Sequence, residues 1–99
     1  MADLLEWVQS WFLRHCDESW EHEYGVTIET LDNPGWLLKV DLKRTELEQV
    51  PFVARQRDEG SEDWYSLKVE DGQFRGAGDA LKLPFLLNAF REWAMGERR

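Results

Sequence analysis

Residues 25–42 read GVTIETLDNPGWLLKVDL and contain the clearest structural pattern in the chain. Before the central turn, Val26 and Ile28 alternate with polar residues; after it, every second residue from Trp36 to Leu42 is apolar. Such alternation is typical of strands with one buried face. Between the two runs, Pro34 and Gly35 suit the second and third positions of a type II turn. The stretch therefore predicts a β-hairpin.

Helical patterns flank this hairpin on both sides. Residues at three- and four-residue spacing predict one helix that ends near residues 16–17 and another with Pro84 in its first turn and Gly96 at its end. The predicted stripe of the first helix is Leu4, Leu5, Val8, Trp11, Phe12 and His15, and the predicted buried face of the last is Leu86, Leu87, Ala89, Phe90, Trp93 and Ala94. Further strands are predicted at 52–57 and 64–69, then a short edge strand at 73–75 and a flexible joint at 76–78.

Short connections between successive strands favour an antiparallel meander. We therefore expect an α+β fold, with a four- to five-stranded antiparallel meander sheet and N- and C-terminal helices packed on one face, in the order α-β-β-β-β-α. At 99 residues, we expect a single domain over residues 1–99. An exposed edge strand near Phe74 would offer a surface for dimerisation.

The charge balance narrows the classes of partner. The chain has 12 basic and 20 acidic residues, a net charge of −8, and its basic residues pair only at 43–44, 55/57 and 98–99. A surface that follows phosphates needs clustered Lys and Arg, so we expect no nucleic-acid binding. No apolar run approaches the ~20 residues that span a bilayer, and the acidic N-terminus is unlike a signal peptide. We therefore expect a cytoplasmic protein that does not bind membranes.

Candidate catalytic groups are few. His15, Cys16 and His22 lie close in sequence, but a zinc site needs three or four ligands at recognisable spacing. Cys16 is the only cysteine, and it lies near a predicted helix C-terminus before Asp17 and Glu18, whose charges raise the pKa of a thiol. We predict no metal, no cofactor and no enzymatic activity.

Aromatic residues stand beside acids at several places. Trp20 and Tyr24 alternate with acids just before the first strand, Trp36 follows the turn, and Trp64 follows an acidic loop. These aromatics either pack at the edge of the core or form, with the neighbouring acids, a surface that binds a partner, and one residue can do both.

The chain resembles the immunity protein 53 family of bacterial polymorphic toxin systems. The resemblance rests on residues 16–17, 20–25 and 28–36, with shorter matches at 41–42, 45–47, 63–64, 74, 76–78, 90 and 93. It implies a small cytosolic antidote that binds and blocks a cognate toxin domain. Many such toxins attack nucleic acids and are basic, so a basic nuclease is the partner that an acidic inhibitor would suit.

We predict that acidic residues steer the toxin and that a few aromatic residues anchor it. The predicted partner-binding residues are Trp20, Glu21, Tyr24, Asp32, Asn33, Trp36, Asp63 and Trp64. Two other hypotheses stay open. One is a small thiol-dependent enzyme that uses Cys16, since some relatives carry a sulfurtransferase-like label. The other is an adaptor with no toxin partner.

Overall fold

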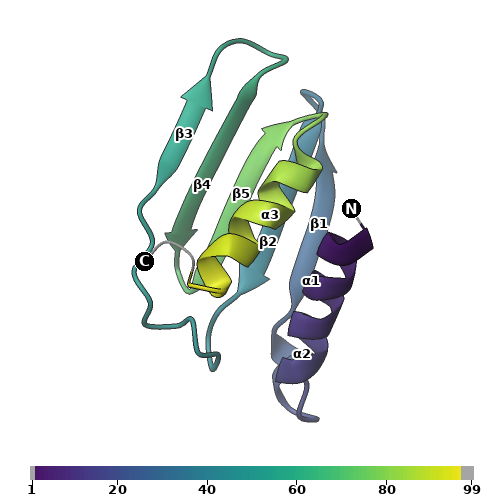
Figure 1. The fold of residues 1–99 in the computed structure, drawn as a ribbon, viewed down its shortest axis with the longest axis vertical. Helices are drawn as coiled ribbons and strands as arrows, with labels where there is room; N and C mark the ends of the chain where they lie inside the picture. Colours follow the sequence, from purple (N-terminus) through teal and green to yellow (C-terminus); the bar gives the residue numbers. More distant parts are fainter. Residues whose placement is uncertain (1, 97–99) are drawn as a thin grey trace.

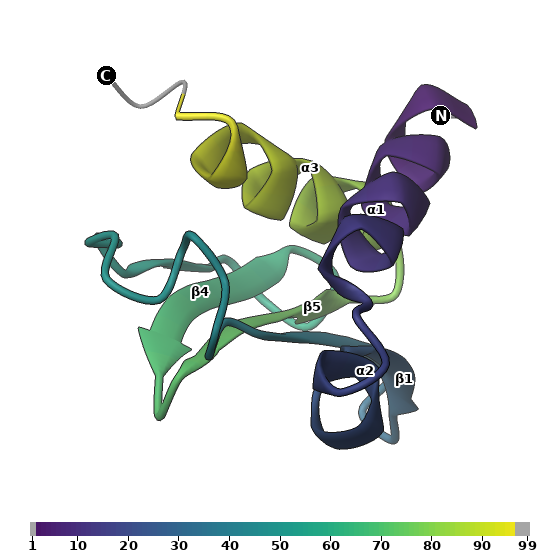
Figure 2. The ribbon, with the colours of Figure 1, turned by 90° about the horizontal axis from the view of Figure 1, so that it is seen from below.

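A computed structural model describes residues 2–96, so the 98–99 basic pair lies outside the described residues. Its elements are α1 (Ala2–His15), α2 (Trp20–Glu23), β1 (Val26–Leu31), β2 (Gly35–Asp41), β3 (Arg55–Asp58), β4 (Trp64–Glu70), β5 (Gln73–Asp79) and α3 (Leu83–Ala94). The five strands form one antiparallel sheet, and α1 and α3 lie on the same side of it (Figures 1 and 2). The α+β fold class is confirmed. No helix among the described residues is long and apolar enough to cross a membrane.

The order of strands across the sheet is β1-β2-β5-β4-β3. The β1–β2 hairpin is confirmed, and β3, β4 and β5 follow one another as a meander. The neighbour of β2 is β5 rather than β3, because the connection after β2 carries the chain past the ends of the strands to the far edge (Figure 1). The edges of the sheet are therefore β1 and β3.

The prediction for residues 73–78 is wrong. They form neither an edge strand nor a flexible joint, because β5 runs without interruption from Gln73 to Asp79 and pairs with both β2 and β4. Phe74 is fully buried, so the dimerisation edge expected there does not exist. Glycines extend the strand because the packing is close: a Cβ on Gly76 would lie 3.3 Å from side chains of Leu67 and Leu86, and one on Gly78 would lie 2.7 Å from the Cβ of Lys82.

The turn between β1 and β2 also differs from the prediction. Its loop comprises residues 32–34, and Gly35 already belongs to β2, paired with Leu31. The φ of Gly35 is not positive, which excludes the predicted type II turn. Glycine serves a different purpose at this position, since a Cβ would lie 2.4 Å from the carbonyl oxygen of Gly78 and 3.2 Å from Cζ2 of Trp64.

The core lies between the sheet and the two long helices. The predicted buried face of α3 is confirmed, and its residues pack on Phe74 and on Trp11 of α1. The predicted stripe of α1 is only partly buried, since Leu4 is in the core but Leu5 is 53% exposed. The third strand is predicted to begin at Phe52, but β3 begins three residues later, at Arg55. Phe52 instead packs edge-on against Phe74 in a segment without regular structure.

The close approach at Gly35 generates a stability prediction. Gly35→Ala should lower the free energy of unfolding by about 1–3 kcal/mol, the usual cost of overpacking, because its methyl group would meet the backbone of Gly78. Gly25→Ala is the matched control, since a Cβ there meets only Phe12, at an ordinary 3.9 Å. Urea denaturation of both variants measures the difference, and equal stability would contradict this account of Gly35.

Candidate partner-binding site

The eight predicted binding residues separate into two groups at opposite ends of the sheet. Trp20, Glu21 and Tyr24 lie in and just after α2. The other five lie at the end where three connections meet: the β1–β2 turn (32–34), the β3–β4 loop (59–63) and the β5–α3 connection (80–82). We call this end the tip. The fold therefore does not bring all eight residues into one surface.

The side chains at the α2 end are engaged within the fold. Trp20 is 1% exposed and donates its indole N–H to the carbonyl oxygen of Lys43, at 2.9 Å. The carboxylate of Glu21 accepts hydrogen bonds from the backbone N–H groups of Asp17 and Glu18, both at 2.9 Å. Trp20 therefore closes the core and Glu21 organises the loop before α2.

Asp17 and Tyr24 are also engaged within the fold. Asp17 accepts hydrogen bonds from the backbone N–H groups of Ser19 and Trp20, at 3.0 and 2.8 Å, and these bonds lower its pKa. Tyr24 is half-buried, with its ring centroid 6.1 Å from that of Trp20. α2 itself is a short helix that the sequence pattern does not predict.

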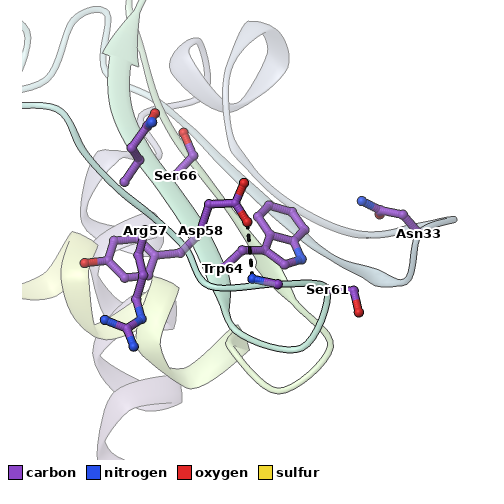
Figure 3. A pocket seen from close by; sticks show the side chains of 9 residues that line it. Asn33, Arg57, Asp58, Ser61, Trp64 and Ser66 are labelled. Carbon is purple, nitrogen blue, oxygen red and sulfur yellow. Dashed lines mark hydrogen bonds between the residues drawn. The ribbon is translucent and has the colours of Figure 1, made fainter.

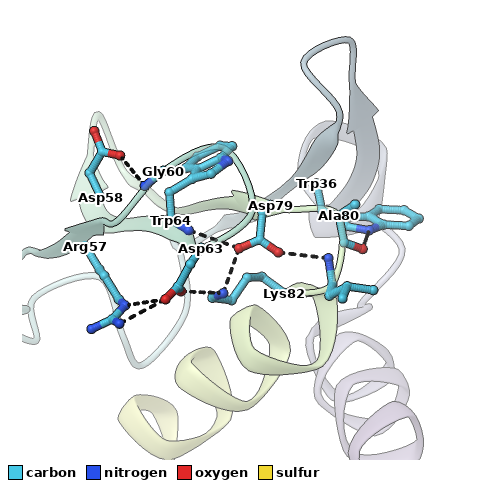
Figure 4. A network of polar contacts seen from close by, with 10 residues as sticks. Trp36, Arg57, Asp58, Gly60, Asp63, Trp64, Asp79, Ala80 and Lys82 are labelled. Atoms are coloured by element: carbon cyan, nitrogen blue, oxygen red, sulfur yellow. Dashed lines mark hydrogen bonds and ion pairs between the residues drawn. The ribbon is translucent and has the colours of Figure 1, made fainter.

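At the tip, a buried carboxylate joins three elements (Figure 4). Asp79, at the end of β5, is 2% exposed. It accepts hydrogen bonds from the backbone N–H groups of Trp64 and Leu81, both at 3.0 Å, and from the ammonium group of Lys82, at 2.6 Å. The hydrogen bond from Lys82 is the main cause of the lowered pKa of Asp79. Asp79 thus connects the start of β4 and the start of α3 to β5.

The same network includes Asp63, one of the predicted binding residues. Its carboxylate accepts two hydrogen bonds from Arg57, at 2.9 and 3.1 Å, and one from Lys82, at 3.0 Å. These bonds, first that from Arg57 and then that from Lys82, lower the pKa of Asp63 to about 2. Asp63 is therefore neutralised by two cations and is not a free acid. Arg57, Asp79 and Lys82 are absent from the predicted set; their only local signal is the three-residue spacing of Asp79 and Lys82 before a helix.

A cleft of about 490 Å³ lies beside this network (Figure 3). Its side chains come from the end of the β3–β4 hairpin and from the β1–β2 turn. They include Asn33, Gln56, Arg57, Asp58, Ser61, Trp64 and Ser66.

The indole of Trp64 is the central feature of the cleft. Residues on successive strand positions point to opposite faces, which places Trp64, Ser66, Gln56 and Asp58 on the face opposite the buried Leu67. This is the face away from α1 and α3. Asp58 is the direct cross-strand partner of Trp64, so both side chains border the same part of the cleft (Figure 3).

Two predicted residues, Asn33 and Trp64, therefore line the cleft. Asp32 is exposed in the turn next to Asn33. Trp36 is on the opposite face of the sheet, where its indole N–H donates to the carbonyl oxygen of Ala80, at 2.9 Å (Figure 4). The tip thus unites part of the predicted set and places Trp36 on its other side.

Acidic residues lie at the cleft or next in sequence to residues that line it. Four exposed side chains of the turn and the hairpin end form no ion pair among residues 2–96: Asp32, Asp58, Glu59 and Glu62.

Elsewhere on the same face, charges are compensated. Lys39 lies 3.9 Å from Glu29, and Lys68 lies 3.1 Å from Glu70. Asp41 accepts a hydrogen bond from the neutral amide of Gln73, at 2.8 Å, and its charge is balanced in number by Arg75, which lies opposite Lys39 on the same face. The uncompensated negative charge of this face is therefore at the tip.

The comparison with protein families gives a match to the model of immunity protein 53 over residues 5–95. The chain belongs to the immunity protein 53 family. No curated protein and no solved structure matches it. Membership of an immunity protein family implies binding to a cognate toxin.

The thiol of Cys16, on which the hypothesis of a thiol-dependent enzyme depends, is engaged within the fold of this immunity protein 53 chain. It donates a hydrogen bond to the carbonyl oxygen of Phe12, at 3.4 Å. Partial burial raises its pKa, and the charges of Glu21 and Asp17 raise it further. The thiolate, which is the reactive form, is thereby disfavoured. Among the described residues, no group of three or more His, Cys, Asp and Glu side chains could hold a metal ion.

The Asp63 ion pairs generate a pH prediction. The folded state lowers the pKa of Asp63 from 3.8 to about 2, so the carboxylate stabilises the fold above about pH 4. This contribution is lost as the pH falls from about 4 to about 2. Asp63→Asn should lower the free energy of unfolding at pH 7. It should also make that free energy decrease less steeply as the pH falls below 4, as measured by urea denaturation at several pH values.

Asp32→Asn provides the control, since Asp32 is exposed and forms no ion pair among the described residues. It should leave both the stability at pH 7 and the acid slope unchanged. If Asp63→Asn behaved like Asp32→Asn, the network would not contribute to stability.

Proposed function

We propose that this chain binds and neutralises a cognate toxin domain of a bacterial polymorphic toxin system by forming a stoichiometric protein–protein complex. The observation that carries the proposal is the family match over residues 5–95. We further propose that the chain acts in the cytoplasm of the producing cell, where such a toxin would otherwise reach its target.

The surface features support inhibition by binding rather than by chemistry. A stoichiometric inhibitor needs a preformed contact surface, and the tip offers a cleft with Trp64 in it. Tryptophan is among the residues that most often anchor interfaces. The free acids of the turn and the hairpin end would add electrostatic steering, which mainly raises the rate of association.

A basic toxin suits this surface best. The net charge of −8 favours association with a positively charged partner. Nucleases present basic surfaces to the phosphates of their substrates, and an acidic inhibitor can occupy such a surface in place of the nucleic acid. We therefore propose a basic nuclease domain as the partner.

Co-expression with the toxin domain encoded beside this chain tests the proposal. We expect the chain to restore growth and to co-purify with that domain in a one-to-one complex. The complex should weaken as salt rises from about 0.05 to 0.5 M, because ions screen interactions between exposed charges. Protection without a complex would instead indicate an enzyme that disarms the toxin or repairs its damage, and absence of protection would favour an adaptor.

A substitution at Cys16 separates binding from thiol chemistry. Cys16→Ser should protect cells as well as the unchanged chain does, because a serine hydroxyl can donate the same hydrogen bond to Phe12. Growth in the co-expression assay measures protection, and circular dichroism shows whether the variant folds. A folded Cys16→Ser chain that fails to protect would support the thiol-dependent enzyme.

A further inference from the structure

We propose that the cleft beside Trp64 and Asp58 is the toxin-contacting site, and that it takes an arginine or lysine side chain from a basic segment of the toxin. This inference rests on the proposed function and specifies the surface and the chemistry of the partner. Four features of the tip support it: the opposed Asp58 and Trp64, their rigid support, the local charge, and the contrast with other surfaces.

Asp58 and Trp64 present two complementary groups to one cation. They are direct cross-strand partners, with side chains on the same face of the sheet. An aromatic face attracts a cation placed over it, most strongly when the ring is tryptophan. A carboxylate forms short, strong hydrogen bonds with guanidinium and ammonium groups. One Arg or Lys side chain in the cleft could therefore contact the indole and the carboxylate together.

The cleft is held in place before a partner arrives. The backbone of Trp64 is fixed by its hydrogen bond to Asp79, and its ring packs against Gly35, where no Cβ intervenes. Asp58 accepts a long hydrogen bond, 3.4 Å, from the backbone N–H of Gly60, which leaves its second oxygen for other contacts. Such preorganisation reduces the conformational entropy lost on binding.

The local electrostatics favour a cation over an anion or an apolar group. Glu59 and Glu62 extend the negative charge of Asp58 along the loop, and neither forms an ion pair among the described residues. Arg57 also lines the cleft, but Arg57 and Lys82 are paired with Asp63 and Asp79, so these four charges sum to zero and the negative charge of Asp58, Glu59 and Glu62 remains. The Asn33 amide and the Ser61 hydroxyl provide further polar groups at the cleft.

A second cleft, of about 590 Å³, has a different character. It lies between the segment before β3 and α3, and apolar side chains of Phe52, Val53 and Ala89 dominate its wall. One basic and one acidic side chain, Arg55 and Glu92, complete it, so it offers a cation no net attraction. Binding through this groove would indicate an apolar partner, and substitutions at the tip would then leave the affinity unchanged.

A charge reversal with a matched control tests the electrostatic part of the inference. Glu59→Lys/Glu62→Lys changes two exposed side chains of the tip, and Glu6→Lys/Glu23→Lys changes two exposed side chains away from it. Both pairs alter the net charge from −8 to −4, because each change adds two positive charges. We expect the tip pair to raise the Kd for the toxin domain at least about tenfold and the control pair to raise it less than about threefold. Equal effects of the two pairs would overturn the proposed site.

A second pair of variants tests the aromatic anchor. Trp64→Ala should raise the Kd about thirtyfold or more, as expected for the loss of an anchoring tryptophan. Leu13→Ala, which removes an exposed apolar side chain of α1 away from the tip, should leave the Kd nearly unchanged. Circular dichroism and thermal unfolding establish that each variant folds, and Trp64→Phe keeps a ring in place if the alanine variant does not. A complex weakened by Trp64→Ala but not by the tip charge reversal would overturn the cationic partner in favour of an apolar one.

A peptide probe tests the site without the toxin. The chain has six tryptophans, whose indole N–H signals can be followed by ¹H–¹⁵N NMR during titration with a tetra-arginine peptide. We expect the Trp64 signal to shift most and Asp58→Asn to reduce that shift at least about threefold. A Trp64 signal that does not move, or moves no more than the other five, would overturn the inference.

The two levels of proposal can fail separately. If the unchanged chain protects cells while the tip variants bind as tightly as the control variants, the proposed function holds and the site is wrong. If the chain neither protects nor forms a complex, but the peptide shifts Trp64 as expected, the cation site holds and the proposed function is wrong.

Discussion

Asp79 is the buried group on which the tip of this molecule depends. It stands where β5 ends, and its carboxylate holds the first residue of β4, the β5–α3 connection and Lys82. A carboxylate this deeply buried must be paired and hydrogen-bonded, because otherwise its desolvation would destabilise the fold. The hydrogen bonds to Asp79 align the ends of the β1–β2 and β3–β4 hairpins and place Trp64 beside the β1–β2 turn. The cleft is a consequence of that alignment.

Acidic residues have two contrasting roles in the part of the chain that the structure describes. Some are internal to the fold: Asp17 and Glu21 bind backbone N–H groups, and Asp63 and Asp79 bind cations. Others, at the hairpin end and the neighbouring turn, face solvent without an ion-pair partner among the described residues. Overall acidity therefore says less about binding than the position of the uncompensated acids does. Their position next to an aromatic cleft is what suits a basic partner.

Much of the fold could be predicted from the sequence, because it follows from local patterns. The alternation around residues 25–42 predicts a hairpin, and the apolar spacing after Pro84 predicts α3 with its correct buried face. The β5 strand could not be predicted in the same way. Its glycines weaken any strand pattern, and their reason lies in partners distant in sequence: Leu67, Leu86 and Lys82. The same holds for Gly35, where glycine is needed because Gly78 and Trp64 approach closely and not because a turn requires it.

The candidate site shows the same division. Composition and pattern, by themselves, determine an acidic, aromatic-rich α+β chain, and the similarity of its residues to immunity protein 53 indicates its family. The sequence could not say which aromatic–acid pairs face a partner, because Trp20 with Glu21 and Trp64 with Asp63 are equally adjacent along the chain. Tertiary packing buries Trp20, engages Glu21 and Asp63, and turns Trp64 toward Asp58 on the open face of the sheet. That choice depends on strand register and on long-range hydrogen bonds, which are interactions between residues far apart in sequence.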